Sequence, residues 1–136
     1  MKMHLEVVTP EGSKVSTHVA DLIAPGAVGE LGILPSHIPV LTVLDIGKLS
    51  YQALDTNEEQ HLAVAGGFLE VDNDRLIVIT ESAEFAAEID VERAEQARQS
   101  SAEELKTLES GSTQFDRRAR SLKRAEVRLA VAKHAG

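Results

Sequence analysis

Few side chains of this 136-residue chain are spaced for catalysis or for metal binding. The sequence contains no cysteine, which excludes a thiolate metal site, a thiol nucleophile and a disulfide framework. The five histidines are scattered, and none of them has a second ligand at metal-binding spacing. No serine, histidine and acidic residue are arranged so as to single out a nucleophile. We therefore expect no catalytic centre and no metal site, and we predict that the chain is not an enzyme.

Charged groups are concentrated in a basic C-terminal segment on an otherwise acidic chain. Residues 112–136 hold seven lysines and arginines against Asp116 and Glu126, whereas residues 1–88 hold four basic and fourteen acidic residues. A solvated helix face is the simplest interpretation of this segment. Nucleic-acid binding is disfavoured, because the chain has a net charge of −8 and only 3% aromatic residues that could stack on bases.

The basic segment lies in a region whose pattern is helical. Residues 90–110 contain no glycine or proline and consist mostly of good helix formers. Asp90 is a suitable N-cap, Gly111 is expected to stop the first helix, and Ser112 or Thr113 can cap a second one. We predict a two-helix hairpin over residues 87–136. Its apolar stripe is thin, which predicts marginal stability and docking on another surface; it comprises Val91, Leu105, Leu108, Phe115, Leu122 and Leu129.

Residues 1–86 have the pattern of a strand-rich domain. Short apolar or alternating segments recur at the spacing of about 8–12 residues that is typical of sandwiches and barrels. Turn signals such as Pro10-Glu11-Gly12 separate them, and the Gly66-Gly67 pair predicts a bulge or a close backbone approach. The predicted fold class is α+β, with an N-terminal antiparallel β-sandwich followed by a C-terminal two-helix hairpin. The separate strands expected in its second half include residues 40–44, 47–54, 61–65 and 68–71.

Three stretches carry motifs of one known family. Residues 29–39 read GELGILPSHIP and fit the pattern G-x-L-G-I-L-P-x-H-x-P; residues 66–71 read GGFLEV and fit G-G-F-x-E-V. Residues 122–129 read LKRAEVRL and are similar to a C-terminal helix in which R-A-x-x-R-L is common. Taken together, from Met3 to about Ala132, the chain resembles the epsilon subunits of F-type ATP synthases.

This resemblance implies a non-catalytic rotor subunit in the central stalk of a proton-translocating ATP synthase. Such a subunit lies at the cytoplasmic face of the bacterial inner membrane, with the equivalent face of a plastid thylakoid as the less favoured alternative, and it meets the membrane only through the complex. The resemblance implies partners in the gamma subunit, the c-ring and the catalytic alpha and beta subunits. The segment around Glu30, Leu31, Gly32 and His37 would contact the c-ring and gamma.

The resemblance also implies a hairpin that either docks on the sandwich or extends along gamma and restrains ATP hydrolysis. In the extended state, basic residues of the second helix would contact an acidic surface on beta. A purely structural subunit with a permanently docked hairpin is the alternative. The basic residues concerned are Arg117, Arg118, Arg120, Lys123 and Arg124.

Residues 89–94 read IDVERA and match I-D-x-x-R-A, a motif of epsilon subunits that bind ATP in the docked hairpin. This match implies that ATP is a regulatory ligand, while no cofactor is required. Arg124 and Arg128 lie four residues apart on one helical face, and converging guanidinium groups bind phosphate oxygens bidentately. The candidate ATP-binding residues are Glu84, Ile89, Asp90, Arg93, Ala94, Arg124 and Arg128.

The ATP-binding pattern is incomplete in this sequence. Ser100 stands where the ATP-binding relatives have a further arginine, and Arg98 lies two residues earlier. An interpretation without any ligand also fits the residues: Asp90 is then only an N-cap, and Arg93 is only an exposed helix residue.

Overall fold

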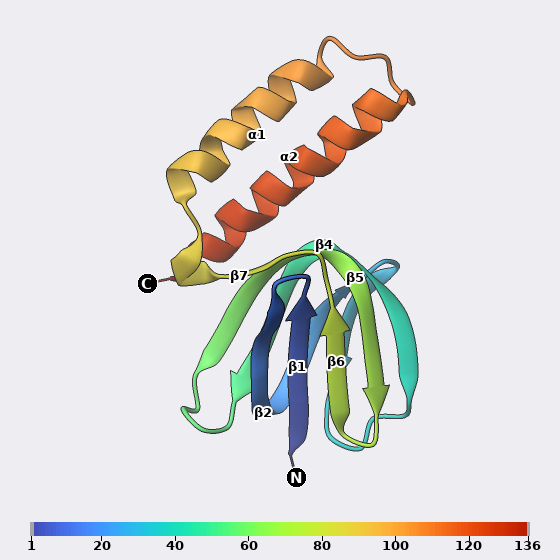
Figure 1. Ribbon diagram of the computed structural model, residues 1–136, viewed down its shortest axis with the longest axis vertical. Coiled ribbons are helices and arrows are strands. Elements are labelled where there is room, and N and C mark those ends of the chain that lie inside the picture. Colours follow the sequence, from blue (N-terminus) through green and yellow to red (C-terminus); the bar gives the residue numbers. More distant parts are fainter. Residues whose placement is uncertain (1, 136) are drawn as a thin grey trace.

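The computed structural model describes residues 2–135 and places seven strands before two helices (Figure 1). This arrangement confirms the predicted α+β class, with a β-sandwich followed by a helical hairpin. The strands are β1 (Met3–Thr9), β2 (Gly12–Gly26), β3 (Gly29–Ile33), β4 (Val40–Ala53), β5 (Glu59–Asp72), β6 (Arg75–Ile79) and β7 (Ala83–Phe85). The short 3-10 helix η1 (Ala86–Glu88) then leads into helices α1 (Val91–Leu105) and α2 (Thr113–Ala132).

The strands of the sandwich close into a ring. Hydrogen-bonded neighbours follow the order β1-β6-β5-β4-β2-β3, and β1 additionally pairs with β2, while β7 pairs with β5. The pairing of β1 with β6 is parallel, from His4 opposite Arg75 to Val8 opposite Ile79. The expectation of a wholly antiparallel sandwich was therefore wrong for this one pair, because the first strand of the chain is inserted between two strands that run in opposite directions.

Strands β4 and β5 are each continuous over 14 residues, whereas the sequence pattern predicted two short strands in each case. They pair antiparallel along almost their whole length, from Val40 opposite Val71 to Gln52 opposite Glu59. Long strands of this kind bend as they pass from one layer of the sandwich to the other, and the bend interrupts the alternation of inward and outward residues. This interruption explains why the sequence pattern predicted two short strands in place of each long one.

Gly67 allows the close backbone approach that the sequence predicted. Its φ is +114°, and a Cβ at this position would lie 1.8 Å from the carbonyl oxygen of Ile79. The glycine pair falls where β5 changes partner, because residues 68–72 pair with β6 and residues 62–64 pair with β7. A side chain at Gly67 would therefore push β5 away from β6 at the point where β5 stops pairing with β6 and begins to pair with β7.

The core of the sandwich is aliphatic. Alternate residues of β1 point inward and are fully buried, as the period of a half-buried strand requires. The other strands contribute large side chains to the same cluster, and several of these have no exposed surface at all. The largest fully buried side chains include Met3, Leu5, Leu22, Ile33, Leu49, Leu62, Leu69 and Leu76.

Both helices of the hairpin begin with a side-chain cap. Oδ1 of Asp90 accepts a hydrogen bond from the backbone N–H of Arg93 at 3.1 Å, which confirms the predicted N-cap. For α2, Oγ of Ser112 accepts from the N–H of Phe115 at 3.1 Å. Helix α1 ends at Leu105, earlier than the predicted stop at Gly111, because the next residues form tight turns in place of helix.

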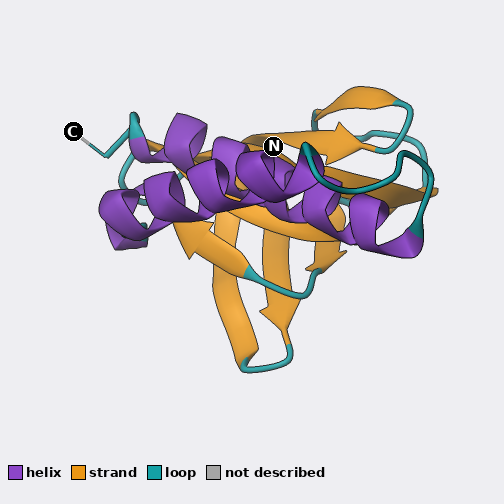
Figure 2. Cartoon of the chain, turned by 90° about the horizontal axis from the view of Figure 1, so that it is seen from above, coloured by secondary structure: helices purple, strands orange, loops and turns teal. Residues whose placement is uncertain are grey.

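The two helices pack through small side chains. The buried residues are Ala94 and Ser101 on α1, with Ala125 and Val131 on α2. Val91 was predicted in the apolar stripe, but it is 54% exposed. Helix α2 packs against β4 and β5, whereas α1 packs mainly against α2, so the hairpin lies across one end of the sandwich (Figure 2).

Candidate functional site

The apolar contact that docks the hairpin on the sandwich is small. Its buried residues are Ala63 of β5, Ile89 before α1 and Val131 near the end of α2. Ala86, Val127 and Ala132 pack against this cluster and are partly buried. Ile89, a candidate ATP-binding residue, therefore belongs to the docking contact.

Ion pairs reinforce this docking contact. Nζ of Lys123 on α2 lies 2.5 Å from Oδ2 of Asp45 on β4, and each side chain is about half exposed. The hydrogen bond from Lys123 holds the pKa of Asp45 below its usual value. Near the start of the hairpin, Nζ of Lys14 on β2 lies 2.8 Å from Oε2 of Glu88, and this bond likewise lowers the pKa of the Glu88 carboxyl.

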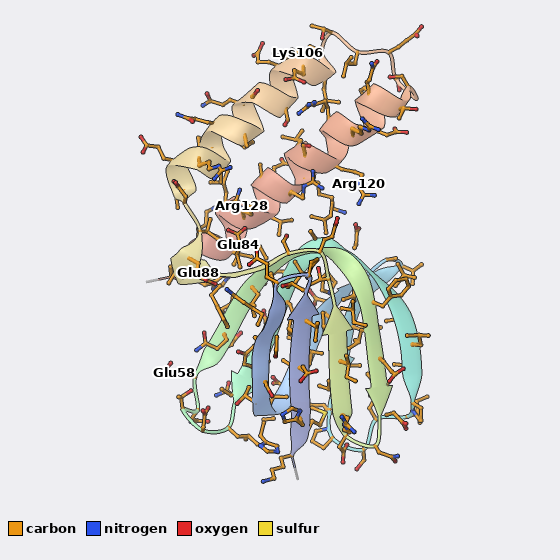
Figure 3. The ribbon with its side chains drawn as sticks, in the orientation of Figure 1. Glu58, Glu84, Glu88, Lys106, Arg120 and Arg128 are labelled. Atoms are coloured by element: carbon orange, nitrogen blue, oxygen red, sulfur yellow. The ribbon has the colours of Figure 1, made fainter. Side chains whose placement is uncertain are left out.

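A third ion pair joins β7 to α2. Nε of Arg128 lies 2.8 Å from Oε1 of Glu84, which is ion-pair distance, and Nη2 donates a hydrogen bond to Oε2 at 3.2 Å, while Nε itself makes no hydrogen bond within residues 2–135. Both side chains are largely buried, at 24% and 32% exposed respectively. Figure 3 shows the two side chains meeting in the gap between the helix and the strand.

A polar pocket of about 440 Å³ opens beside this ion pair, between the sandwich and both helices. Its volume is within the range of small-molecule sites. Serines and arginines dominate its walls, which gives it hydroxyl and guanidinium donors and the single carboxylate of Glu84. The lining residues are Ser82, Glu84, Ala97, Ser100, Ser101, Arg118, Ser121, Arg124, Ala125 and Arg128.

The three arginines of the pocket differ in how far they are neutralised. Arg128 is paired with Glu84, and Nε of Arg118 lies 2.7 Å from Oε2 of Glu104 on α1. Nη2 of Arg124 donates only to Oγ of Ser121, at 3.2 Å, and within residues 2–135 no carboxylate lies at ion-pair distance from it. Arg124 is therefore the arginine of the pocket with most of its charge available for an anion.

The structure brings together three of the seven candidate ATP-binding residues: Glu84, Arg124 and Arg128 line the pocket. Asp90 caps α1, Arg93 is exposed and Ala94 is buried, and none of these three lines the pocket. Ser100, which occupies the position of the missing arginine, does line it.

Sequence reasoning missed Arg118 and Ser121 as pocket residues. A signal was present, because Arg118, Ser121, Ala125 and Arg128 follow spacings of three and four residues, which place them on one face of a helix. Ser82 and Ser101 gave no such signal, since their place in the pocket depends on how the helices meet the sandwich.

The basic residues assigned to inhibition are largely engaged in this docked conformation. Lys123 pairs with Asp45, Arg118 with Glu104, and Arg124 lies in the polar pocket. Arg120 points from α2 towards the end of the sandwich (Figure 3), where it lines a second cleft, and Arg117 is exposed.

The residues assigned to the c-ring and gamma lie in strand as well as loop. Glu30, Leu31 and Gly32 belong to β3, which pairs with β2, although the glycines and prolines of residues 29–39 had suggested a loop over this whole segment. The following loop contains His37, whose Nδ1 lies 2.7 Å from the carbonyl oxygen of Ile38. The backbone N–H of Ser36 in this loop donates to Asp74 at 2.6 Å, in the β5–β6 turn at the end of the sandwich remote from the hairpin (Figure 1).

An exposed apolar row crosses the outside of the sandwich. Val43, Phe68, Ile79 and Val8 stand opposite one another on β4, β5, β6 and β1. Phe68 is 52% exposed and Ile79 is 56% exposed. Exposed apolar groups of this size in register are typical of a protein-binding surface. The residues between 2 and 135 form no group of acidic and histidine side chains that could hold a metal ion, and no helix among them is long and apolar enough to cross a membrane.

Two family models match the chain. The model of the ATP synthase delta/epsilon chain β-sandwich domain matches residues 2–86, and that of the delta/epsilon long α-helix domain matches residues 87–133. The ATP synthase epsilon chain of Geotalea daltonii is 42% identical over 135 residues, which is 99% of this chain and 96% of the relative. That of Geotalea uraniireducens is 41% identical over 131 residues, covering 96% and 94%.

Solved structures share the fold at low sequence identity. A chain of the Euglena gracilis mitochondrial ATP synthase, from a structure containing OSCP, F1 and the c-ring, superposes with a TM-score of 0.81 at 20% identity. The alignment covers 95% of this chain and 80% of the other. The two domain matches and the full-length identity together show that this chain belongs to the family of ATP synthase delta/epsilon chains.

Proposed function

We propose that the chain is a non-catalytic epsilon subunit in the rotor of a proton-translocating F-type ATP synthase, held at the cytoplasmic face of a bacterial inner membrane by its complex. In this proposal the sandwich is the anchor and the hairpin is a switch. ATP binds the docked hairpin in the polar pocket, and the extended hairpin contacts the beta subunit and restrains hydrolysis. The convergence of Arg118, Arg124 and Arg128 on one pocket formed by docking is the observation that supports the switch most directly.

The anchoring role draws on two surfaces of the sandwich. The apolar row of Val8, Val43, Phe68 and Ile79 suits a partner with a complementary apolar face, which we assign to gamma. The second surface is the polar segment that carries Glu30 on β3 and His37 in the loop after β3, and it suits the polar loops of a c-ring. The two surfaces together would couple gamma to the c-ring.

The switching role depends on a docked state that is easily left. The docking contact buries three apolar residues and adds three ion pairs, of which the two partly exposed ones, Lys14–Glu88 and Lys123–Asp45, are each worth up to about 1 kcal/mol. A ligand that binds only the docked form shifts the balance by its differential affinity. Because Lys123 is paired with Asp45 of the sandwich, it becomes available to beta only when the hairpin leaves the sandwich.

Calorimetric titration of the isolated chain with ATP tests this proposal. We expect saturable binding that weakens at least tenfold in Arg124→Ala, since a charge-assisted bond contributes about 1.5–3 kcal/mol. Arg117→Ala is the matched control, because Arg117 lies on the same helix outside the pocket. Absence of binding, or equal weakening in both variants, would contradict ATP sensing.

Removal of residues 89–136 from the assembled enzyme tests inhibition separately. Faster ATP hydrolysis is expected if the hairpin restrains the rotor. Unchanged hydrolysis would favour the purely structural subunit with a permanently docked hairpin.

A further inference from the structure

Two histidines that are far apart in the sequence stack where the end of the hairpin meets the sandwich. The ring of His61 on β5 and the ring of His134 after α2 have centroids 3.8 Å apart and planes inclined by only 18°. The side chain of His61 is 11% exposed, and its Nδ1 lies 2.9 Å from Oγ of Ser50 on β4. This histidine stack is separate from the polar pocket and adjoins the apolar docking contact through Ala86.

The charged groups around the histidine stack lie on β4, on β5 and in the turn that precedes β5. Nζ of Lys48 on β4 lies 3.5 Å from Nε2 of His134, so a neutral His134 accepts a hydrogen bond from it. Oε1 of Glu59 on β5 lies 3.4 Å from Nε2 of His61, and Glu58 lines the same cleft. The part of η1 that faces the cleft contributes only Ala86 and Ala87.

This environment favours a neutral His61. Burial, with the nearby His134 and Lys48, lowers the pKa of His61, while Glu59 opposes the shift. Protonation of His61 would place a charge in a largely buried ring, in face-to-face contact with the ring of His134 and near the ammonium group of Lys48. When the hairpin leaves the sandwich, both rings become solvated and no longer face these charges.

We propose that the histidine stack is a pH-sensitive contact that releases the C-terminal end of α2 from the sandwich as the surroundings become acidic. The direction follows from linkage, because the undocked state binds protons more readily than the docked state. The docked state keeps its full stability above the ordinary histidine pKa of about 6.5 and loses it as the pH falls towards the lowered value. Each additional proton taken up on release changes the ratio of docked to undocked chains by up to about tenfold per pH unit.

The absence of cysteine makes the test straightforward, because an introduced pair of cysteines can be labelled specifically. Fluorescence energy transfer between labels at Ser110→Cys, beyond α1, and Asp72→Cys, on the sandwich, reports docking in the full chain without nucleotide. We expect transfer to fall as the pH is lowered from about 8 to about 5, the range in which histidine changes charge.

Substitution of His61 or His134 then shows whether these two side chains cause the pH dependence of docking. His134→Gln should remove most of the pH dependence; His134 is exposed, so its replacement leaves the sandwich core intact. His61→Gln should act in the same way, and Lys48→Gln should move the transition to lower pH. His4→Gln is the matched control, because His4 is paired with His18 on the sandwich and should leave the transition unchanged.

Two results would overturn the proposal: constant transfer across this pH range in the parent chain, or an unaltered transition in both His61→Gln and His134→Gln. The ion pairs of Lys123 with Asp45 and of Lys14 with Glu88 do not produce a transition in this range, because the pKa values of both carboxyl groups are lowered from the usual carboxyl values.

Discussion

The sandwich and the hairpin are stabilised in different ways, although one short 3-10 helix joins them. The sandwich surrounds large aliphatic side chains with a closed ring of strands, and many of these side chains are completely buried. The hairpin joins its helices through alanine and serine and rests on the sandwich through a few apolar residues and ion pairs. The contact between the hairpin and the sandwich is therefore much smaller than the core of the sandwich.

The two kinds of packing differ in how easily they can be rearranged. Large buried side chains resist any rearrangement, since each lost contact creates a cavity. Small residues and charged groups can exchange one partner for another at little cost, because water and new ion pairs replace the old ones. In the proposed function, this difference assigns anchoring to the sandwich and switching to the hairpin.

The largest expected effect is at Gly67, in the tightly packed sandwich. Gly67→Ala should lower the free energy of unfolding of the sandwich by about 2–4 kcal/mol, because the new Cβ meets the backbone of Ile79 and φ is positive. Urea unfolding of the full chain measures the loss. Gly32→Ala is the control, since no atom lies within 4 Å of its Cβ position, and equal losses in both variants would contradict this account.

Val131→Ala should weaken the docking of the hairpin on the sandwich and leave the stability of the sandwich unchanged. The side chain is fully buried, and removing two carbons costs about 1.5 kcal/mol, which corresponds to roughly tenfold faster hydrogen exchange in α2. Amides of the sandwich core should keep their exchange rates. Equal acceleration in both regions would mean that they unfold as one unit; Val91→Ala, at an exposed position, is the control.

Asp45→Asn should have the smallest effect. The ion pair with Lys123 is about half exposed, so we expect its loss to weaken docking by less than about 1 kcal/mol. Because the pKa of Asp45 is lowered, the contribution is complete above the usual carboxyl pKa and disappears as the pH falls through the lowered value.

Energy transfer between the same two labels, recorded against salt concentration, checks this prediction. The parent chain should undock slightly as salt rises, and Asp45→Asn should respond less. Glu103→Gln provides the control, since its pair with Lys106 lies within the hairpin and not across the docking contact. A larger salt response in Asp45→Asn than in the parent would count against the assigned role.

The sequence predicted the features that depend on neighbouring residues. The strand-rich half, the hairpin and the N-cap of Asp90 all follow from local pattern and hydrogen-bonding chemistry. Arg124 and Arg128 were paired correctly because helical periodicity relates them directly. Asp90 and Arg93, from the motif at residues 89–94, do not line the pocket in which the arginines meet, so the ligand site predicted from this motif stays a prediction.

The features that the sequence did not predict depend on distant contacts. The parallel pairing of β1 with β6 joins residues about seventy positions apart, and no local pattern specifies it. The apolar row of Val43, Phe68 and Ile79 likewise requires the register of several strands. The stack of His61 and His134 depends on where the last turn of α2 meets the sandwich, which spacing in the sequence cannot give.

The closure of the sandwich by its first strand also has a consequence for biosynthesis. β1 is made first, yet one of its two edges remains unsatisfied until β6 has left the ribosome. Such a contact has high sequence separation, so it forms late and slows the folding of the nascent chain. The helices emerge after the ring can close, so the hairpin is synthesised only when the strands that form its docking surface have already been made.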